Sequence, residues 1–278
     1  MTPTPDIMLN NGQPIPQLGF GVFLIKPEDT VEAVTTALET GYRHIDTAEM
    51  YGNEREVGEA IAKSGLSRGE VFVTSKLNNG SHLPDDARQA FGQTLDELGF
   101  DYIDMFLIHW PLPMKYDGDF VSTWETLAEF YREGRARSIG VSNFQAHHLR
   151  RLHGQSDIPP AVNQIEVSPY LTQDDLRMFC GEHQIAVEAW SPLARGGDLL
   201  NDPEVKRISK ETGKTPAQVV LRWHIERGDI VFPKSVNPSR IRENFDIFDF
   251  ELPGSDVAAI SALNKNERVG PDPDTFSG

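Results

Sequence analysis

Short apolar runs and longer helix-like segments alternate along most of this chain. The run at 71–77 (VFVTSKL) is followed by a helix-like segment at 84–99, and the run at 102–110 (YIDMFLIHW) by one at 121–134. The same pairing of a strand-like run with a helix-like segment occurs eight times, at 19–23 with 29–41, 42–48 with 54–65, 71–77 with 84–99, 102–110 with 121–134, 137–143 with 145–154, 161–167 with 172–184, 185–192 with 215–228, and 229–235 with 238–248. This alternation predicts parallel strands joined by helices.

The strand-like runs are continuously apolar, and this property decides the fold class. Such strands are buried on both faces, as happens when helices cover the outside of a barrel and packed side chains fill its inside. We therefore predict an α/β fold, a (β/α)8 TIM barrel. The turn signal Asn11-Gly12 predicts an N-terminal β-hairpin within 6–20 across the barrel floor. A C-terminal helix within 256–265 and a polar tail from Asn266 complete a single barrel domain, 1–278, with no linker.

Four polar side chains near the downstream ends of the early strands predict an active site, because these ends open on one face of a parallel barrel. They are Asp46, Tyr51, Lys76 and His109. A tyrosine hydroxyl, with an ordinary pKa of about 10, exchanges its proton poorly at neutral pH. A neighbouring Lys76 ammonium lowers that pKa, and Asp46 keeps Lys76 charged and oriented. With His109 donating a hydrogen bond to the substrate oxygen, Tyr51 is predicted to protonate a carbonyl group.

Carbonyl reduction also needs a hydride, which no side chain supplies, so a nicotinamide or flavin cofactor is required. The usual dinucleotide-binding fingerprint is missing, since Leu24 stands where the third glycine of 19–24 is needed. Instead, Lys234 and Ser235 follow the eighth strand and Arg240 lies near the start of the next helix. Barrels often bind phosphate at this place, so the pattern predicts a phosphorylated cofactor.

Residues at neighbouring strand ends suit the other end of such a cofactor. Ser142, Asn143 and Gln164 can hydrogen-bond a carboxamide, and Trp190 offers a flat face for a nicotinamide ring. For Gln164 and Trp190, packing in the core is a competing interpretation.

Charge and cysteine content narrow the partners. A net charge of -16 repels polyanions, which argues against nucleic acid and acidic membranes. The one cysteine, Cys180, makes no intrachain disulfide, and the first residues resemble no secretion signal, so we expect a cytoplasmic protein. His147, His148 and His153 have no Cys or carboxylate at metal spacing nearby in the sequence, so they are interpreted as helix surface and no metal site is expected.

Several sequence motifs, in order over about residues 15–250, resemble those of the aldo-keto reductases, among them bacterial 2,5-diketo-D-gluconate reductases and related actinobacterial enzymes. The motifs are GYRHIDTAEMYGNE, SKL, LIHWP, IGVSNF, AVNQIEVSPY, WSPL and FPKSVNPSRIRENFDIFDF. The resemblance implies an NADPH-dependent reductase of small aldehydes, ketones or dicarbonyls, with Asp46, Tyr51, Lys76 and His109 as the catalytic tetrad. It implies that NADPH is bound by Ser142, Asn143, Gln164, Trp190, Ser191, Leu193, Phe232, Lys234, Ser235, Val236, Arg240, Glu243 and Asn244.

The resemblance also implies a substrate pocket, and here the chain departs from its relatives. The pocket residues are Phe23, Met50, Asn78 and Trp110, and many relatives have tryptophan in place of Asn78. Asn237 stands where some relatives have a further arginine, which leaves Lys234 and Arg240 as the main phosphate partners. The segments that decide the substrate are short, which implies an open site for a small carbonyl substrate, in a protein expected to be a monomer.

Two other classes of protein stay open at this point. In a lyase barrel, Lys76 would form a Schiff base, but a carboxylate partner holds the amine charged and argues against this. In a regulatory barrel, NADPH would be a sensed ligand with little turnover.

Overall fold

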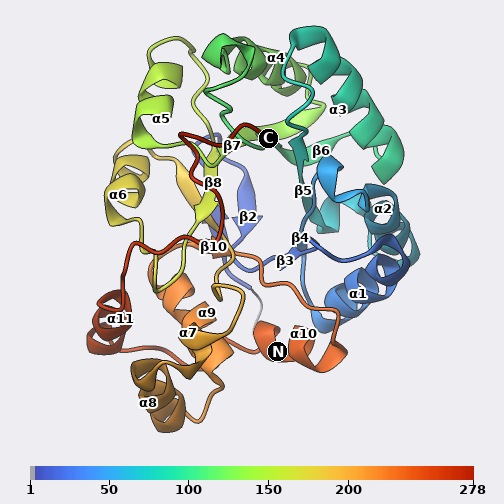
Figure 1. Cartoon of the computed structure of the whole chain (residues 1–278). Helices are drawn as coiled ribbons and strands as arrows, with labels where there is room; N and C mark the ends of the chain where they lie inside the picture. The colour runs from blue at the N-terminus through green and yellow to red at the C-terminus, as the bar shows by residue number, and fades with distance from the viewer. Residues whose placement is uncertain (1–3) are drawn as a thin grey trace.

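Eight parallel strands form one sheet that curls into a barrel in the computed structural model, which describes residues 4–278 (Figure 1). The strands are β3 (Phe20–Gly21), β4 (His44–Asp46), β5 (Phe72–Leu77), β6 (Ile103–Ile108), β7 (Ala136–Ser142), β8 (Val162–Glu166), β9 (Ala186–Trp190) and β10 (Ile230–Val231). Each strand pairs in parallel with its neighbour in the chain. The predicted (β/α)8 barrel is confirmed.

The barrel closes where its first and last strands meet. Leu18 forms a parallel bridge with Val231, whose carbonyl accepts a hydrogen bond from the N–H of Gly19 at 2.8 Å. Closure leaves no free sheet edge, and it fixes the ends of all the strands relative to one another.

The N-terminal hairpin covers the floor of the barrel, as predicted. Strands β1 (Asp6–Met8) and β2 (Pro14–Pro16) pair antiparallel around a turn in which Gly12 has a φ of 82°. Ile15 is fully buried and packs in one cluster with side chains inside the barrel, including Met105, Leu107 and Val162. Because apolar side chains plug this end, polar chemistry is confined to the other end.

Helices surround the barrel (Figure 1). They are α1 (Pro27–Thr40), α2 (Glu54–Lys63), α3 (Pro84–Leu98), α4 (Val121–Arg132), α5 (Ala146–His153), α6 (Asp174–Glu182), α7 (Asp198–Asn201), α8 (Pro203–Thr212), α9 (Pro216–Glu226), α10 (Pro238–Phe245) and α11 (Gly254–Ser261). Helices α7 and α8 lie between the segments 185–192 and 215–228, in residues to which the sequence analysis assigned no helix. The missed signal was Asp202, whose carboxylate accepts the N–H of Glu204 and caps α8 just before Pro203.

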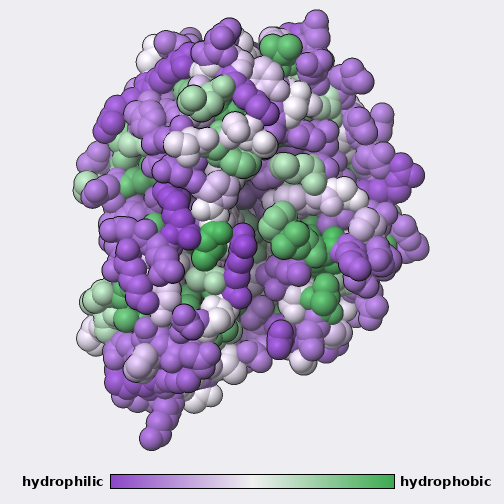
Figure 2. Space-filling view, viewed as in Figure 1, coloured by the Kyte–Doolittle hydropathy of each residue, from purple (hydrophilic) through white to green (hydrophobic). Residues whose placement is uncertain are grey.

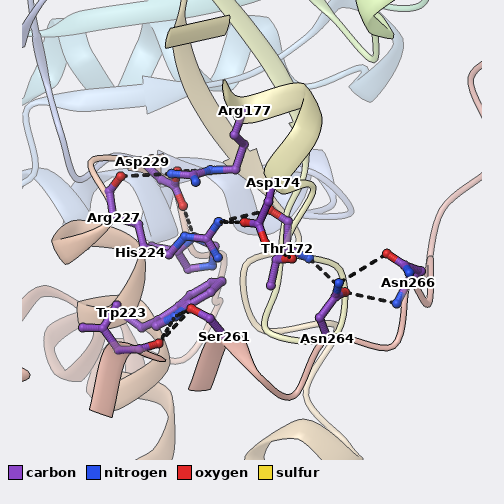
Figure 3. Close-up of polar contacts among 11 residues, drawn as sticks. Thr172, Asp174, Arg177, Trp223, His224, Arg227, Asp229, Ser261, Asn264 and Asn266 are labelled. Carbon is purple, nitrogen blue, oxygen red and sulfur yellow. Dashed lines mark hydrogen bonds and ion pairs between the residues drawn. The ribbon is translucent and has the colours of Figure 1, made fainter. Parts of the chain in front are cut away.

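A network of polar contacts anchors the C-terminal segment to the barrel wall (Figure 3). Arg227 of α9 donates to the carbonyl of Thr172 and to the carboxylate of Asp174 at 2.7 Å. The N–H of Thr172 in turn donates to Asn264, just beyond α11. From there residues 264–278 cross the near face of the barrel, the dark red segment in Figure 1. Among residues 4–278, no helix is long and apolar enough to cross a membrane.

The contact between α2 and α3 gives a test of the packing. A Cβ added to Gly58 would lie 2.1 Å from the carbonyl oxygen of Leu98, whereas one added to Gly92, within α3, meets nothing within 4 Å. Gly58→Ala should therefore destabilise the protein by about 1 to 3 kcal/mol because the two helices must separate. Gly92→Ala should stabilise it by about 0.5 to 1 kcal/mol through helix propensity. Urea unfolding of both variants checks this, and equal effects would contradict the packing.

Candidate active site

The four side chains singled out from the sequence meet at the open end of the barrel. Asp46 ends β4, Lys76 lies near the end of β5, and His109 directly follows β6. Tyr51 lies in a short 3-10 helix (Glu49–Tyr51) after β4, with its ring 5.8 Å from that of His109. Asp46, Lys76 and His109 are buried. The strand ends thus assemble residues that lie far apart in the chain.

Lys76 is the centre of this group. Its ammonium donates to Asp46 Oδ1 at 2.8 Å, to the carbonyl of Thr47 at 2.8 Å and to the hydroxyl of Tyr51 at 3.4 Å. An ammonium has three N–H donors, so all of them are used. Because its nitrogen has no free lone pair, Lys76 is unsuited to attack a carbonyl carbon, and this argues against the Schiff-base lyase.

A buried amide fixes the segment that carries Tyr51. Asn53 donates to the carbonyls of Val22 and Ile25, both at 3.1 Å, and accepts a hydrogen bond from the hydroxyl of Thr47 at 3.0 Å. These contacts tie the residues after β4 to those after β3. The tyrosine hydroxyl therefore has a defined place beside Lys76.

The pKa shifts follow from burial and from the Lys76 charge. Burial raises the pKa of Tyr51, and the Lys76 ammonium opposes the rise without cancelling it. The lowering of the Tyr51 pKa by Lys76 that the sequence predicted is present, but burial is the larger effect and sets the net direction. Burial disfavours the charged form of Lys76 too, but the negative charge of Asp46 and its hydrogen bond outweigh burial and raise the pKa of Lys76. Tyr51 is thus a neutral phenol, the form able to donate a proton.

His109 is a neutral imidazole. Burial first, and then the positive charge of Lys76, hold its pKa well below the ordinary value. A neutral imidazole has one N–H donor, which suits hydrogen bonding to a carbonyl oxygen without competing for the proton of Tyr51. Asn143 accompanies it, donating to the backbone carbonyl of His109 at 2.9 Å.

The residues predicted to bind the carboxamide and ring of the nicotinamide also lie together. Asn143 has a φ of 65°, a strained conformation that turns its amide inward, where its oxygen accepts the indole N–H of Trp190 at 2.8 Å. Ser142 donates to the backbone carbonyl of Gln164 at 2.9 Å. The structure brings all four residues together around the mouth of the barrel.

Gln164 lies between two buried carboxyl groups. Its amide nitrogen donates to Asp46 Oδ2 at 2.7 Å and to Glu188 Oε2 at 2.7 Å, so only its carbonyl oxygen is left for a ligand. Glu188, in the middle of β9, was missed by the sequence analysis. Its signal was a charged residue inside an otherwise apolar strand.

The predicted phosphate residues lie after β10. Lys234 and Arg240 are exposed, and neither forms an ion pair with another residue of the described range 4–278. Asn237 caps α10, its side-chain oxygen accepting the N–H groups of Ser239 and Arg240. Because these two N–H groups are taken, binding of an anion here relies on side-chain charge. Glu243 accepts a hydrogen bond from Thr215 at 2.8 Å.

The remaining predicted cofactor residues lie in the segments after β9 and β10 and on α10. Phe232 and Asn244 are buried and Val236 is exposed. Ser235 is largely buried, and its hydroxyl accepts the N–H of Asn237 at 3.0 Å. Ser191 has a φ of 50° in the turn after β9, and Leu193 packs against the main core.

Apolar side chains lie around the tetrad. Phe23 is half-exposed and packs on Tyr51 with ring centres 5.0 Å apart, and Met50 is also half-exposed. Trp110 is buried, and its ring centre lies 4.3 Å from that of Phe276 in the C-terminal tail. Figure 2 shows hydrophobic residues around a hollow near the centre of the face on which the strands open. Asn78 is held near this region by a 3.2 Å hydrogen bond from its N–H to Glu49.

The C-terminal tail covers part of the mouth. The carboxylate of Glu166 accepts the N–H groups of Val269 at 2.6 Å and Gly270 at 3.1 Å. A Cβ on Gly270 would lie 2.3 Å from the ring of Trp190, so only glycine allows this approach. The sequence analysis expected an open site and missed this contact between the tail and Trp190.

His148 on α5 differs from the surface residue expected from the sequence, whereas His147 and His153 are exposed, as expected. His148 is buried, and both His147 and His148 approach the carboxylate of Asp274, at 3.3 and 3.8 Å. His148 Nδ1 accepts the N–H of Gln145, so Nε2 carries the proton of the neutral ring. That nitrogen cannot bind a metal while the cap exists, and the three residues instead fasten the tail to α5.

Comparisons with known proteins agree with this geometry. The model of the Aldo/keto reductase family matches residues 17–265. The chain belongs to this family. It is 51% identical over 274 residues to an aldo-keto reductase of Mycolicibacterium smegmatis (99% of this chain, 98% of that protein). It is 45% identical over 273 residues to the methylglyoxal reductase DkgA of Escherichia coli (98% of each). A mutant of Gox0644 in complex with NADPH has a TM-score of 0.94 and 40% identity over 99% of both chains.

Family membership confirms the resemblance that was recognised from the sequence motifs and makes this aldo-keto reductase an oxidoreductase acting on carbonyl groups. The individual site residues remain predictions, which the contacts above support.

Removing the proposed proton donor is the first test. Tyr51→Phe keeps the ring but loses the hydroxyl, so carbonyl reduction should fall by about two to four orders of magnitude while NADPH binding changes little. Tyr131→Phe, a half-buried tyrosine on α4, is the matched control and should keep normal turnover. Near-normal kcat in Tyr51→Phe would refute the assigned chemistry.

Lys76→Met tests the role of the ammonium. Because the Lys76 charge lowers the pKa of Tyr51, its loss should raise that pKa further. A pH profile of carbonyl reduction by Lys76→Met should show lower kcat throughout and an alkaline limb moved to higher pH, or out of range. An unmoved alkaline limb would show that Lys76 does not act on the proton donor.

Proposed function

We propose that this aldo-keto reductase uses NADPH to reduce small, polar carbonyl compounds, dicarbonyls above all, with Tyr51 as the proton donor. The observation that carries the proposal is the neutral Tyr51 hydroxyl 3.4 Å from the Lys76 ammonium, which is itself paired with buried Asp46. A neutral acid next to a fixed cation suits a reaction in which negative charge develops on an oxygen.

The residues act in a definite order in this scheme. His109 donates its N–H to the substrate carbonyl oxygen and orients it beside the Tyr51 hydroxyl. A bound nicotinamide cofactor would provide the hydride for the carbonyl carbon. As charge grows on the oxygen, Tyr51 gives up its proton and the resulting phenolate is stabilised by Lys76, whose own charge is maintained by Asp46. Solvent then returns the proton to Tyr51.

The cofactor is NADP(H), since a similar chain of this family was solved with NADPH and the residues present suit it. The face of Trp190 would support the nicotinamide ring, and Ser142, Asn143 and the free carbonyl oxygen of Gln164 would bind its carboxamide. Lys234 and Arg240, exposed and without carboxylate partners among residues 4–278, would bind the 2'-phosphate. The other predicted cofactor residues complete the groove between these two ends.

The substrate class is supported by the pocket and by one relative. Asn78 places an amide where many relatives have a flat indole, and Phe23, Met50 and Trp110 supply a limited apolar wall. The methylglyoxal reductase DkgA of Escherichia coli, 45% identical, acts on a small dicarbonyl according to its name. We further propose a cytoplasmic, monomeric enzyme in which residues 1–278 act as one domain, with no nucleic-acid or membrane partner.

The function is tested by NADPH oxidation with a panel of substrates. Methylglyoxal and other small dicarbonyls should be reduced with a higher kcat/KM than aromatic aldehydes of similar reactivity. Absence of turnover on the whole panel, with tight NADPH binding, would instead support the regulatory barrel left open by the sequence.

Asn78→Trp tests the substrate preference. The indole adds apolar contact area and removes a hydrogen-bonding amide, so the ratio of kcat/KM for aromatic aldehydes to that for methylglyoxal should rise. The expected rise is roughly 10-fold, the worth of about 1.4 kcal/mol of differential binding. Asn79→Ala, at the neighbouring buried amide, is a control for damage to the loop. An unchanged ratio in Asn78→Trp would remove residue 78 from the pocket.

Arg240→Ala tests the phosphate site. Loss of a charge-assisted hydrogen bond should weaken NADPH binding by about 1.5 to 3 kcal/mol, or roughly 10- to 150-fold, and leave NADH binding nearly unchanged. Arg242→Ala, exposed on the same helix, is the matched control. Added salt should narrow the preference for NADPH. Equal dissociation constants for NADPH and NADH in the wild type would refute a phosphate site at Lys234 and Arg240.

A further inference from the structure

Glu188 is a fully buried carboxyl group inside the barrel that the reaction scheme does not use. It lies opposite Gln164 in the register of β8 and β9, and its Oε2 accepts an amide N–H of Gln164 at 2.7 Å. The other N–H of that amide goes to Asp46 Oδ2, also at 2.7 Å. One amide thus separates two buried carboxyl groups.

The contacts around Glu188 favour its neutral form. Its Oε1 is buried and has no hydrogen-bond partner among residues 4–278, and Oε2 has a single neutral donor. The three N–H groups of the nearby cation, Lys76, donate to Asp46, Thr47 and Tyr51. A buried carboxylate without a cation or several donors is costly, so the group keeps its proton. Burial first, and then the Asp46 charge, raise the pKa of Glu188 to about 8.

The position of Glu188 places this proton close to the expected nicotinamide. Glu188 and Trp190 are two residues apart on β9, and alternate residues of a strand point to the same side, about 6.6 Å apart. Gln164, which Glu188 holds, offers its carbonyl oxygen to the carboxamide in the proposed function. The nicotinamide of NADP⁺ carries a positive charge, and that of NADPH is neutral.

We propose that Glu188 discriminates between the oxidised and reduced cofactors by losing its proton when NADP⁺ binds and keeping it when NADPH binds. This inference rests on the nicotinamide placement of the proposed function. When NADP⁺ binds to the enzyme with protonated Glu188, the complex contains ionised Glu188 and one proton is released to solvent. At neutral pH and below, NADP⁺ is then held less tightly, which favours its release after carbonyl reduction.

Most of the other titratable groups facing this site have pKa values shifted away from the neutral range. From β4, burial lowers the pKa of His44 to about 3. Tyr51, after β4, and Lys76, on β5, have pKa values raised above already alkaline ordinary values. His109, after β6, has a pKa well below its ordinary value. Two carboxyl groups remain, Asp46 and Glu166, and burial raises the pKa of each. Asp46 is paired directly with the Lys76 ammonium, and Glu166 accepts two backbone N–H groups, contacts that Glu188 does not have.

The first experiment measures the dissociation constants of NADPH and NADP⁺ from pH 6 to 9.5 by quenching of protein fluorescence. Titration of the 2'-phosphate is common to both cofactors and cancels in the ratio of the two constants. In the wild type, the affinity for NADP⁺ relative to NADPH should rise roughly tenfold as pH rises from about 7 to about 8, because the ionised carboxylate attracts the positive nicotinamide. In Glu188→Gln, which preserves shape and the hydrogen bond to Gln164, the ratio should stay flat.

Glu166→Gln is the matched control. It removes a carboxylate that also points into the mouth but is held by two backbone N–H groups, and it should keep the wild-type dependence. A flat ratio in the wild type would overturn the proposal, as would a pH dependence that survives in Glu188→Gln or is lost in Glu166→Gln alone.

A second experiment needs only the wild type and so does not depend on the folding of a variant. Calorimetric titrations at pH 7.5 in two buffers with different ionisation enthalpies give the protons released on binding. NADP⁺ should release about half a proton more than NADPH does. Equal proton release would overturn the proposal. Failure of the proposed function looks different, because neither cofactor would then bind, or both would bind without carbonyl reduction.

Discussion

The buried ion pair between Lys76 and Asp46 is the interaction on which the active site depends. A buried lysine and a buried aspartate are tolerable here because they are paired and hydrogen-bonded. Lys76 uses its three N–H donors, and each carboxylate oxygen of Asp46 accepts a hydrogen bond. Breaking such a pair from one side costs about 3 to 5 kcal/mol, since the remaining charge is left unpaired. The pair therefore fixes the positions of β4 and β5 and aims a permanent positive charge at Tyr51.

Charge balance around this pair explains the other polar residues inside the barrel. Lys76 can neutralise one carboxylate, and Asp46 takes that place. Gln164 separates Asp46 from Glu188, so the second carboxyl group must hold a proton or face a cation from outside. A nicotinamide that changes its charge during the reaction is such a cation. Burial first, and then the positive charge of Lys76, keep His109 neutral.

Much of the fold was predictable because its signals are local. Continuous apolar runs, the Asn11-Gly12 turn and the order of the strand ends lead to the barrel, its floor and the meeting of Asp46, Tyr51, Lys76 and His109. What the sequence could not show depends on contacts distant in the chain. Burial of Tyr51, which the sequence does not show, outweighs the lowering of its pKa by Lys76. The contacts of Gly270 with Trp190 and of His148 with Asp274 form only because the C-terminal tail crosses the open end of the barrel.

The protonation state of Lys76 tests the central claim most directly. Nitrogen-15 NMR of the lysine side chains, with the Lys76 signal assigned by its loss in Lys76→Arg, reports whether the amine is charged. The account predicts that Lys76 remains an ammonium from pH 6 to 10, with slow exchange of its protons because all three are hydrogen-bonded. A neutral amine at pH 7 would contradict it, since neither the proton donor at Tyr51 nor the charge balance around Gln164 would then hold.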